Sequence, residues 1–249
     1  MGRERLKIGL FGDIHANLEA LETVLSELEK EKVDLYLCLG DIVGYGANPC
    51  ECLERSRELS LMTVAGNHDY AIAGKLNIDF FNAYAKEAVL WTREQLSREQ
   101  IQYLRDLDLV HKHDDVLTIV HGTLNFPEMF DYIQTSYDAH LSLELLETPI
   151  CFLGHSHVPV AFFQGLEDRV VPPNQAEAMV AALEAQGIPH AYVAFEGEQH
   201  GYVLLDMTHE RTQGEWWYVD SITDQASGEY YATGLFTRSG ENHLRRAEA

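Results

Sequence analysis

The stretch Ile8-Gly-Leu-Phe-Gly-Asp-Ile-His15 sets the pattern of the chain: a short apolar run, a glycine, and then side chains that bind metals. The pattern returns with Asp41 after residues 35–39, with Asn67 and His68 after 61–65, and with His155 and His157 after 150–153. A fifth run, 116–120, leads directly into His121 without a glycine. Short aliphatic runs are typical of buried strands. Because parallel strands deliver their C-terminal ends to one edge of a sheet, we expect these side chains to converge on one cleft.

Helical periodicity fills the intervals between these runs. Four leucines share one helix face, at positions Leu18, Leu21, Leu25 and Leu28, and Asn17 can cap the start of that helix. Further helices are predicted to begin near Pro49, to cover residues 82–95, and to run from a capping box at 97–100 towards Asp106. Strands that alternate with helices predict an α/β fold with helices packed on a central sheet.

Composition and charge exclude several classes of protein. A chain of 249 residues with 46% hydrophobic residues can build a substantial core. Its 18 basic and 40 acidic residues give a formal charge of −22, which disfavours duplex nucleic acid as a partner. The charged N-terminus precedes only four apolar residues, and no stretch approaches the ~20 apolar residues of a membrane span. We therefore expect a cytoplasmic protein without membrane contact.

The four cysteines show no paired spacing of the kind that binds zinc. They are Cys38, Cys50, Cys52 and Cys151, and the first and last lie inside predicted strands. We expect reduced thiols rather than disulfides or a thiolate metal cluster.

The recurring ligand types indicate a site for two divalent ions. Carboxylates, imidazoles and an amide suit Mn²⁺, Fe²⁺, Co²⁺, Ni²⁺ or Zn²⁺ better than an all-oxygen calcium site, and Mn²⁺ is the favoured choice. A single Asp-x-His pair is a frequent accident, and an isolated histidine after a strand is more often structural. The full ordered set, each member following a predicted strand, is what indicates the site.

Five motifs carry a resemblance to a known family: Gly12-Asp-Ile-His15, Gly40-Asp41, Gly66-Asn-His-Asp69, Val120-His121-Gly122 and Gly154-His-Ser-His157. In this order they resemble the motifs of calcineurin-like metallophosphoesterases over about residues 6–160. The segment from Gly40 to Pro49 looks like the small bacterial and archaeal phosphodiesterase branch. The resemblance implies a four-layer α/β/β/α sandwich with an atypical C-terminal third.

The resemblance also implies roles for the site residues. One ion would be held by Asp13, His15 and His157, the other by Asn67, His121 and His155, and Asp41 would bridge them. Two such ions about 4 Å apart polarise phosphoryl oxygens and supply a bridging hydroxide as nucleophile. The expected reaction is hydrolysis of phosphodiesters or small phosphomonoesters. The oligomeric state and the particular substrate stay open.

His68 and Asp69 are the predicted catalytic residues. His68 would protonate the leaving alkoxide or stabilise its charge, and Asp69 would orient its ring. Some proteins with this fold lack the catalytic histidine and act as scaffolds. A metal-binding interaction scaffold without turnover therefore stays open as the alternative, although His68 favours an enzyme.

The last third resembles other families. Residues 161–202 look like the C-terminal part of prolyl-oligopeptidase-type hydrolases, with Asp168 and His200 at the triad positions but no serine elbow, so a serine hydrolase is disfavoured. That segment predicts a strand at 161–163, a helix at 174–186 and a strand at 191–195. Residues 203–249 predict a hairpin of strands 216–222 and 230–237, with a fainter similarity to alkaline-phosphatase-D-like enzymes.

We thus expect one domain over 1–249, composed of a metal-site core at 1–160, a hydrolase-like βαβ insert at 161–202 and a C-terminal hairpin segment at 203–249. The chain reads as a composite, and the join close to His155 and His157 is expected to loosen the second sheet. The remaining histidines are not expected to be ligands: His111, His113, His140, His190, His209 and His243.

Overall fold

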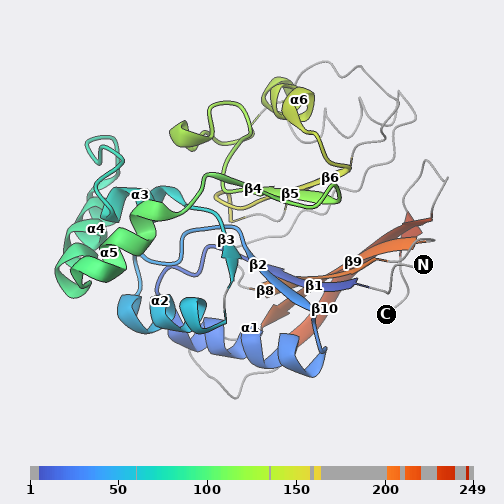
Figure 1. Ribbon diagram of the computed structural model, residues 1–249, viewed down its shortest axis with the longest axis horizontal. Helices are drawn as coiled ribbons and strands as arrows, with labels where there is room; N and C mark the ends of the chain where they lie inside the picture. The colour runs from blue at the N-terminus through green and yellow to red at the C-terminus, as the bar shows by residue number, and fades with distance from the viewer. Residues whose placement is uncertain are drawn as a thin grey trace.

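The computed structural model describes residues 6–59, 61–134, 136–157, 160–163, 201–207, 211–219, 229–238 and 245–246. These residues form two sheets that face each other, with helices on both outer sides (Figure 1). The four-layer α/β/β/α sandwich expected from the sequence is confirmed.

The first sheet has the strand order β11-β10-β9-β8-β1-β2-β3. Its parallel part comprises β1 (Leu6–Phe11), β2 (Leu35–Cys38) and β3 (Met62–Thr63). Its antiparallel part comprises β8 (Gly201–Met207), β9 (Arg211–Val219), β10 (Glu229–Arg238) and β11 (Arg245–Arg246). The two parts meet where β8 pairs antiparallel with β1, from Leu6↔Met207 to Leu10↔Val203.

The second sheet has the order β4-β5-β6-β7, with β4 (Val110–His113), β5 (Leu117–Val120), β6 (Ile150–Leu153) and β7 (Val160–Phe163). Only the central pair, β5 and β6, is parallel. The parallel strands of both sheets are the five apolar runs identified in the sequence, and β7 confirms the strand predicted at 161–163.

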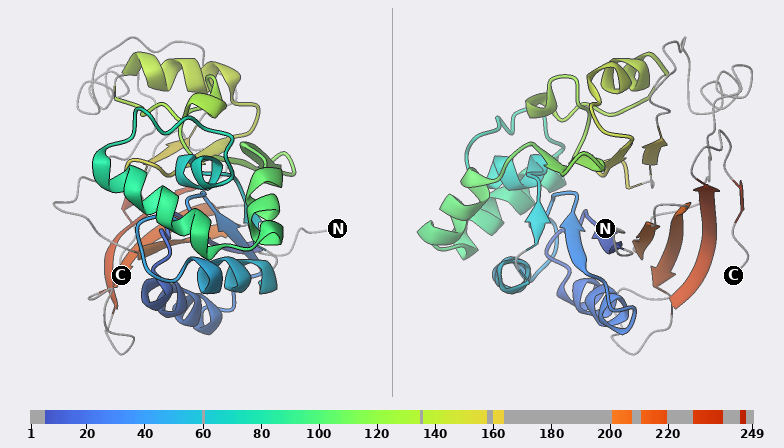
Figure 2. Two further views of the ribbon diagram at one scale, coloured as in Figure 1. Left: turned by 90° about the vertical axis from the view of Figure 1, so that its left-hand side faces the viewer. Right: turned by 45° about the vertical axis from the view of Figure 1, so that its right-hand side comes forward.

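Side-chain alternation along the strands builds two packing layers. The core between the sheets contains Ile8, Leu10, Leu37 and Leu39 from one sheet and Leu117, Ile119, Ile150 and Phe152 from the other. On the outer face of the first sheet, Phe11 and Cys38 pack against the leucine face of α1 (Leu18–Lys30) and against α2 (Pro49–Glu58). The second sheet is covered by α6 (Ser136–Leu145), whose Ala139 packs near Val120 and Leu153 (Figure 2). A strand buried on both faces needs apolar side chains at every position, which explains the continuous runs.

The predicted helix starts are confirmed by their caps. Asn17 Oδ1 accepts a hydrogen bond from the Ala20 N–H at 3.0 Å, and Asn82 caps α4 (Ala83–Gln95) in the same way. Ser97 and Gln100 form the predicted capping box of α5 (Arg98–Asp106). Three helical elements were not predicted: α3 (Asn67–Ile72), the single 3₁₀ turn η1 (Pro127–Met129) and α6.

The C-terminal third contributes to the first sheet rather than standing apart. The predicted hairpin is confirmed as β9 and β10, with the first strand starting earlier and ending at Val219. β7 pairs with β6 from Ile150 to Leu153 and so extends the second sheet beyond the ligand-bearing strand. The helix predicted at 174–186, the strand at 191–195 and the turn at 226–228 lie outside the described residues.

Two further expectations concern the chain as a whole. All four cysteines carry free thiols, as predicted, and Cys38 and Cys151 are buried within strands. Within the residues that the structure describes, we find no helix with the length and apolar character needed to cross a bilayer.

Candidate metal centre

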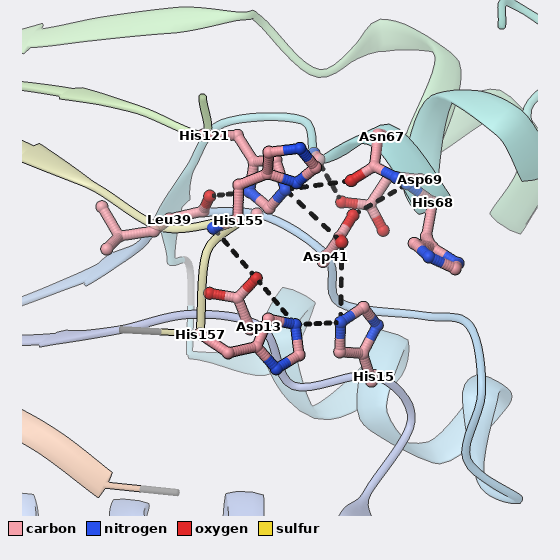
Figure 3. A network of polar contacts seen from close by, with 12 residues as sticks. Asp13, His15, Leu39, Asp41, Asn67, His68, Asp69, His121, His155 and His157 are labelled. Atoms are coloured by element: carbon pink, nitrogen blue, oxygen red, sulfur yellow. Dashed lines mark hydrogen bonds and ion pairs between the residues drawn. The ribbon is translucent and has the colours of Figure 1, made fainter. Parts of the chain in front are cut away.

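The seven predicted ligands come together at the C-terminal ends of the parallel strands of both sheets (Figure 3). The first sheet supplies Asp13 and His15 after β1, Asp41 after β2 and Asn67 at the start of α3. The second sheet supplies His121 after β5, and His155 and His157 after β6. Backbone hydrogen bonds connect the loops after β1 and β2. The N–H groups of Asp13 and His15 donate to the carbonyl groups of Gly40 and Asp41, at 3.0 and 2.9 Å.

One group of ligand atoms consists of Asp13, His15 and His157, whose donor atoms all lie within 4.8 Å of one another. The Nε2 atoms of His15 and His157 are 3.1 Å apart, and Nε2 of His157 lies 3.7 Å from Asp13 Oδ1. The three donors therefore converge on one small volume, which is the arrangement expected for a cation between them.

A second group consists of Asp41, His121 and His155, again within 4.8 Å of one another. His121 Nε2 lies 3.4 Å from Asp41 Oδ2 and 3.2 Å from Asn67 Oδ1, so the amide belongs to this side of the site. His121 and Asp41 are almost fully buried, with side chains 1% and 2% exposed.

Asp41 lies between the two groups. Its Oδ2 atom is 3.6 Å from His15 Nε2 and 3.4 Å from His121 Nε2. Its Oδ1 atom accepts a hydrogen bond from the backbone N–H of His68 at 2.9 Å, which fixes the orientation of the carboxylate. This is the position predicted for the bridging ligand, and that role stays a prediction.

The hydrogen bonds of His121 show that the residues fit a metal. Nδ1 lies 2.7 Å from the Leu39 carbonyl oxygen, an acceptor, so Nδ1 carries the proton. Nε2 is then the ring atom that faces the oxygens of Asp41 and Asn67. Once Nε2 has lost its proton, its lone pair and these oxygens could coordinate a cation among them, and a carbonyl behind a ligating histidine is the usual support.

The protonation states also suit metal binding. Burial lowers the pKa of His15 to about 3 and that of His155 to about 4, so both rings are neutral at pH 7 with a lone pair available. Burial would raise the pKa of Asp41, but His121 and His15 hold it well below its usual range. Burial likewise opposes the charge on His121, yet Asp41 and Asp13 raise its pKa to about 9. Metal binding would therefore release a proton from His121.

Five of the predicted ligands sit in the left-handed backbone region: Asp13, His15, Asp41, His155 and His157, with φ between 49° and 67°. Such conformations cost about 1–3 kcal/mol each in non-glycine residues and persist where the surroundings impose them, often at functional sites. Gly66 shows how tightly the loops pass each other, since a Cβ there would lie 1.9 Å from Asp41 Oδ1.

The structure gives Asp69 a different position from the expected one. Its two carboxylate oxygens accept hydrogen bonds from the backbone N–H groups of Val43 and Gly66, at 3.2 and 3.0 Å. Nδ1 of His68 is buried and, among the described residues, has no hydrogen-bond partner, so it is not oriented by Asp69. Asp69 instead ties the loop after β2 to the start of α3, because it occupies the third position of that helix and caps it.

His68 itself lies beside the first group, with a ring nitrogen within 4.8 Å of the donor atoms of His15 and Asp41. Its ring is held by Tyr45 at a centroid distance of 4.5 Å and by Phe81 at 5.3 Å. Sequence reasoning missed these aromatic neighbours and Tyr132, which stacks on His155 at 3.9 Å. Tyr45 stands inside a motif already singled out, so its position after a ligand strand was the available signal.

Of the histidines set aside, His111 and His113 lie on β4, and His140 pairs with Glu144 on α6 at 3.3 Å. The other three, together with Asp168 and His200, lie outside the described residues.

Comparison with known proteins places this two-sheet fold and its ligand set in a family. The family model for calcineurin-like phosphoesterases matches residues 6–187. The chain belongs to the calcineurin-like phosphoesterase family, and the match continues beyond residue 160, into the segment that resembled a serine hydrolase.

Three individual proteins are similar to this chain. An uncharacterised protein of Methanocaldococcus jannaschii is 39% identical over 157 residues, which are 61% of this chain and 63% of that protein, so the match spans less than two thirds of its length. A crystal structure of a metallophosphoesterase from Sphaerobacter thermophilus is 33% identical, covers 80% of this chain and 83% of its own, and superposes with a TM-score of 0.57. A hypothetical protein of Pyrococcus horikoshii has the same fold, with a TM-score of 0.59 at 19% identity, over 91% of this chain and 88% of its own.

Proposed function

We propose that the protein is a metal-dependent phosphoesterase with a two-ion centre, acting on phosphodiesters or small phosphomonoesters. The observation that carries the proposal is the position of Asp41, whose carboxylate lies between two groups of metal-binding side chains. Family membership supports hydrolysis of a phosphoester as the reaction class. Two divalent ions bound there, with Mn²⁺ favoured, would polarise the phosphoryl oxygens and lower the pKa of the attacking water.

The chain's own residues contribute charge and position. Asp13 and Asp41 offset about half the charge of two divalent ions, which leaves the centre attractive to an anionic ester without trapping the product. The Asp69 carboxylate binds the N–H groups of Val43 and Gly66, and the His68 N–H binds Asp41. These hydrogen bonds fix the loop that carries Asp41 against the start of α3. A shift of this loop by an ångström would misplace the reacting phosphorus relative to its attacking water.

His68 is the proposed group for the leaving oxygen. Burial lowers its pKa, with Asp41 acting in the opposite direction, so the neutral ring is favoured at pH 7. A neutral imidazole can still donate its N–H to the oxygen that leaves, and the rings of Tyr45 and Phe81 keep it in place. The structure offers no contact by which Asp69 would assist that ring.

The proposal is tested with chelated protein and two chromogenic esters, bis(p-nitrophenyl) phosphate and p-nitrophenyl phosphate. We expect chelation to abolish hydrolysis and added Mn²⁺ to restore it. Asp41→Asn protein, purified in the same way, is the control: any hydrolysis that it shows measures contaminating phosphatase from the expression host. Hydrolysis that survives chelation would contradict the proposal. Metal binding without turnover of either ester would support the scaffold alternative instead.

A further inference from the structure

Two tyrosines flank the donor groups from separate loops. Tyr45 lies in the loop after β2, and Tyr132 lies between η1 and α6. Both are about half exposed, at 50% and 49%, although each contacts a buried histidine. Aromatic surface left open beside a group of convergent polar atoms is a common feature of ligand sites.

Each ring is anchored to the site by a stacking or edge contact. Tyr132 lies flat on His155, with centroids 3.9 Å apart and an interplanar angle of 16°. Tyr45 is tilted by 47° against His68 at 4.5 Å and meets His15 edge-on at 4.9 Å. His155 and His15 belong to different donor groups, so the two tyrosines approach the centre beside different groups.

The two tyrosines border the same centre, because the histidines they contact lie near one carboxylate. Tyr45 contacts His15, whose Nε2 lies 3.6 Å from Asp41 Oδ2. Tyr132 contacts His155, whose donor atom lies within 4.8 Å of that of Asp41. The two rings therefore flank Asp41, one on each donor group.

A small hollow lies beside His155 on the Tyr132 side. It is lined by Gly122, Asp131, Tyr132, Ile133, Leu153, Gly154, His155 and Ser156. The lining combines apolar side chains, Ile133 and Leu153, with polar ones, Asp131, His155 and Ser156. Such a mixture suits a ligand with an apolar face and a polar edge, as a nucleobase has.

We propose that Tyr45 and Tyr132 are specificity-determining residues that select phosphodiesters carrying a planar aromatic group, with a nucleoside base as the biological form of that group. The inference rests on the proposed function and names its substrate class. The phosphate would lie over the donor groups, and the retained aromatic group would lie against the half-exposed ring of Tyr132, at the edge of the hollow beside His155. Tyr45 would border the side of His68, where the other ester oxygen leaves.

The test compares two diesters that release the same p-nitrophenol and differ only in the retained group: the p-nitrophenyl ester of thymidine monophosphate, and methyl p-nitrophenyl phosphate. Because the broken bond is the same, the ratio of their kcat/KM values reports recognition of the base. We expect the Mn²⁺-loaded protein to prefer the nucleoside ester by about tenfold or more, as base stacking on an aromatic side chain allows. Tyr132→Leu should bring the ratio close to one, and Tyr45→Leu should lower it less.

Three controls separate stacking from damage to the site. Tyr132→Phe keeps the ring and should keep most of the ratio. Tyr84→Leu, on α4 with a side chain 82% exposed, should leave the ratio unchanged. Calorimetric binding of thymidine monophosphate and of methyl phosphate should show the same preference without turnover.

The outcomes are distinguishable. Metal-dependent hydrolysis of both diesters with a ratio near one, or a ratio that neither leucine variant changes, would overturn aromatic selection and leave the proposed function standing. If the metal-loaded protein hydrolyses p-nitrophenyl phosphate but neither diester, this inference fails and the proposed function stands. If it hydrolyses none of the three esters, both fail.

Discussion

The two sheets contribute different chemistry to the same centre. The loops of the first sheet bring both carboxylates, Asp13 and Asp41, and are tied together by backbone hydrogen bonds. The loops of the second sheet bring three imidazoles, His121, His155 and His157. Both carboxylates therefore come from the first sheet, which also supplies His15 and Asn67, whereas the second sheet supplies imidazoles alone. The site depends on the apolar core between the two sheets.

The difference also appears in burial. Asp41 and His121 are enclosed where the sheets meet, whereas the His157 side chain is 36% exposed at the open side. Water can substitute for an exposed ligand but not for an enclosed one. Loss of a ligand should therefore cost most at the centre of this interface and least at its rim.

The largest effect should come from Asp41→Asn, because one carboxylate faces both donor groups. We expect phosphodiester hydrolysis to fall by about a thousandfold or more and metal content to fall with it. Kinetics on bis(p-nitrophenyl) phosphate and elemental analysis check this. Asp115→Asn, in the exposed turn before β5, is the matched control and should behave like the wild type. Full metal content in Asp41→Asn would contradict the shared role.

His68→Asn should separate catalysis from metal binding on the first-sheet side. We expect kcat to fall at least about a hundredfold, since general acid or hydrogen-bond assistance to a leaving group contributes about 10²–10⁴. Metal content should stay at the wild-type level, because His68 is not among the predicted ligands. A variant with unchanged kcat would remove His68 from the mechanism.

Two imidazoles of the second sheet, one buried and one partly exposed, allow us to test whether burial of a ligand determines how much metal affinity its loss costs. His121→Asn removes the most deeply buried imidazole of the enclosed side, while His157→Asn opens a position that water can reach. We expect Mn²⁺ affinity to fall about tenfold more in His121→Asn than in His157→Asn. Metal titration of both variants measures this, and equal losses would show that burial does not rank the ligands.

The smallest effect concerns pH and the metal-free protein. Burial lowers the pKa of His155 to about 4, so between about pH 6.5 and 4 the unfolded chain binds a proton there that the folded chain does not. His155 therefore destabilises the metal-free wild type as pH falls through this window. His155→Asn lacks this proton uptake, so its stability relative to the wild type should improve towards pH 4. Urea titrations in the presence of chelator at several pH values measure the free energy of unfolding of both proteins. A difference in that free energy that does not change with pH would contradict this prediction.

Much of the site could be predicted from the sequence because each ligand follows a buried strand. The apolar runs ended by Gly12, Gly40, Gly66 and Gly154 identified strand ends, and the parallel pairing of β1 with β2 and of β5 with β6 brought those ends together. The third run is less regular: only Met62 and Thr63 form a strand with β2. Val64 still donates its N–H to the Cys38 carbonyl at 3.2 Å, and on its other side it forms an isolated bridge with Asp108.

What could not be predicted depends on contacts between distant segments. The pairing of β8 with β1 joins residues about 200 positions apart, and the chain carries no local signal for it. β4, with the sequence Val-His-Lys-His, lacks an apolar run and exists because it pairs with β5. Asp69 was read as a partner of His68 because they are adjacent, but adjacent residues on a helix point in different directions, so its carboxylate reaches Val43 and Gly66 instead.

The most direct test of the central claim is a calorimetric titration of the chelator-treated full chain with Mn²⁺. We expect close to two ions to bind per chain, with release of protons on binding. Binding of no ion, or saturation at one ion that Asp41→Asn does not disturb, would contradict a centre shared by the two sheets.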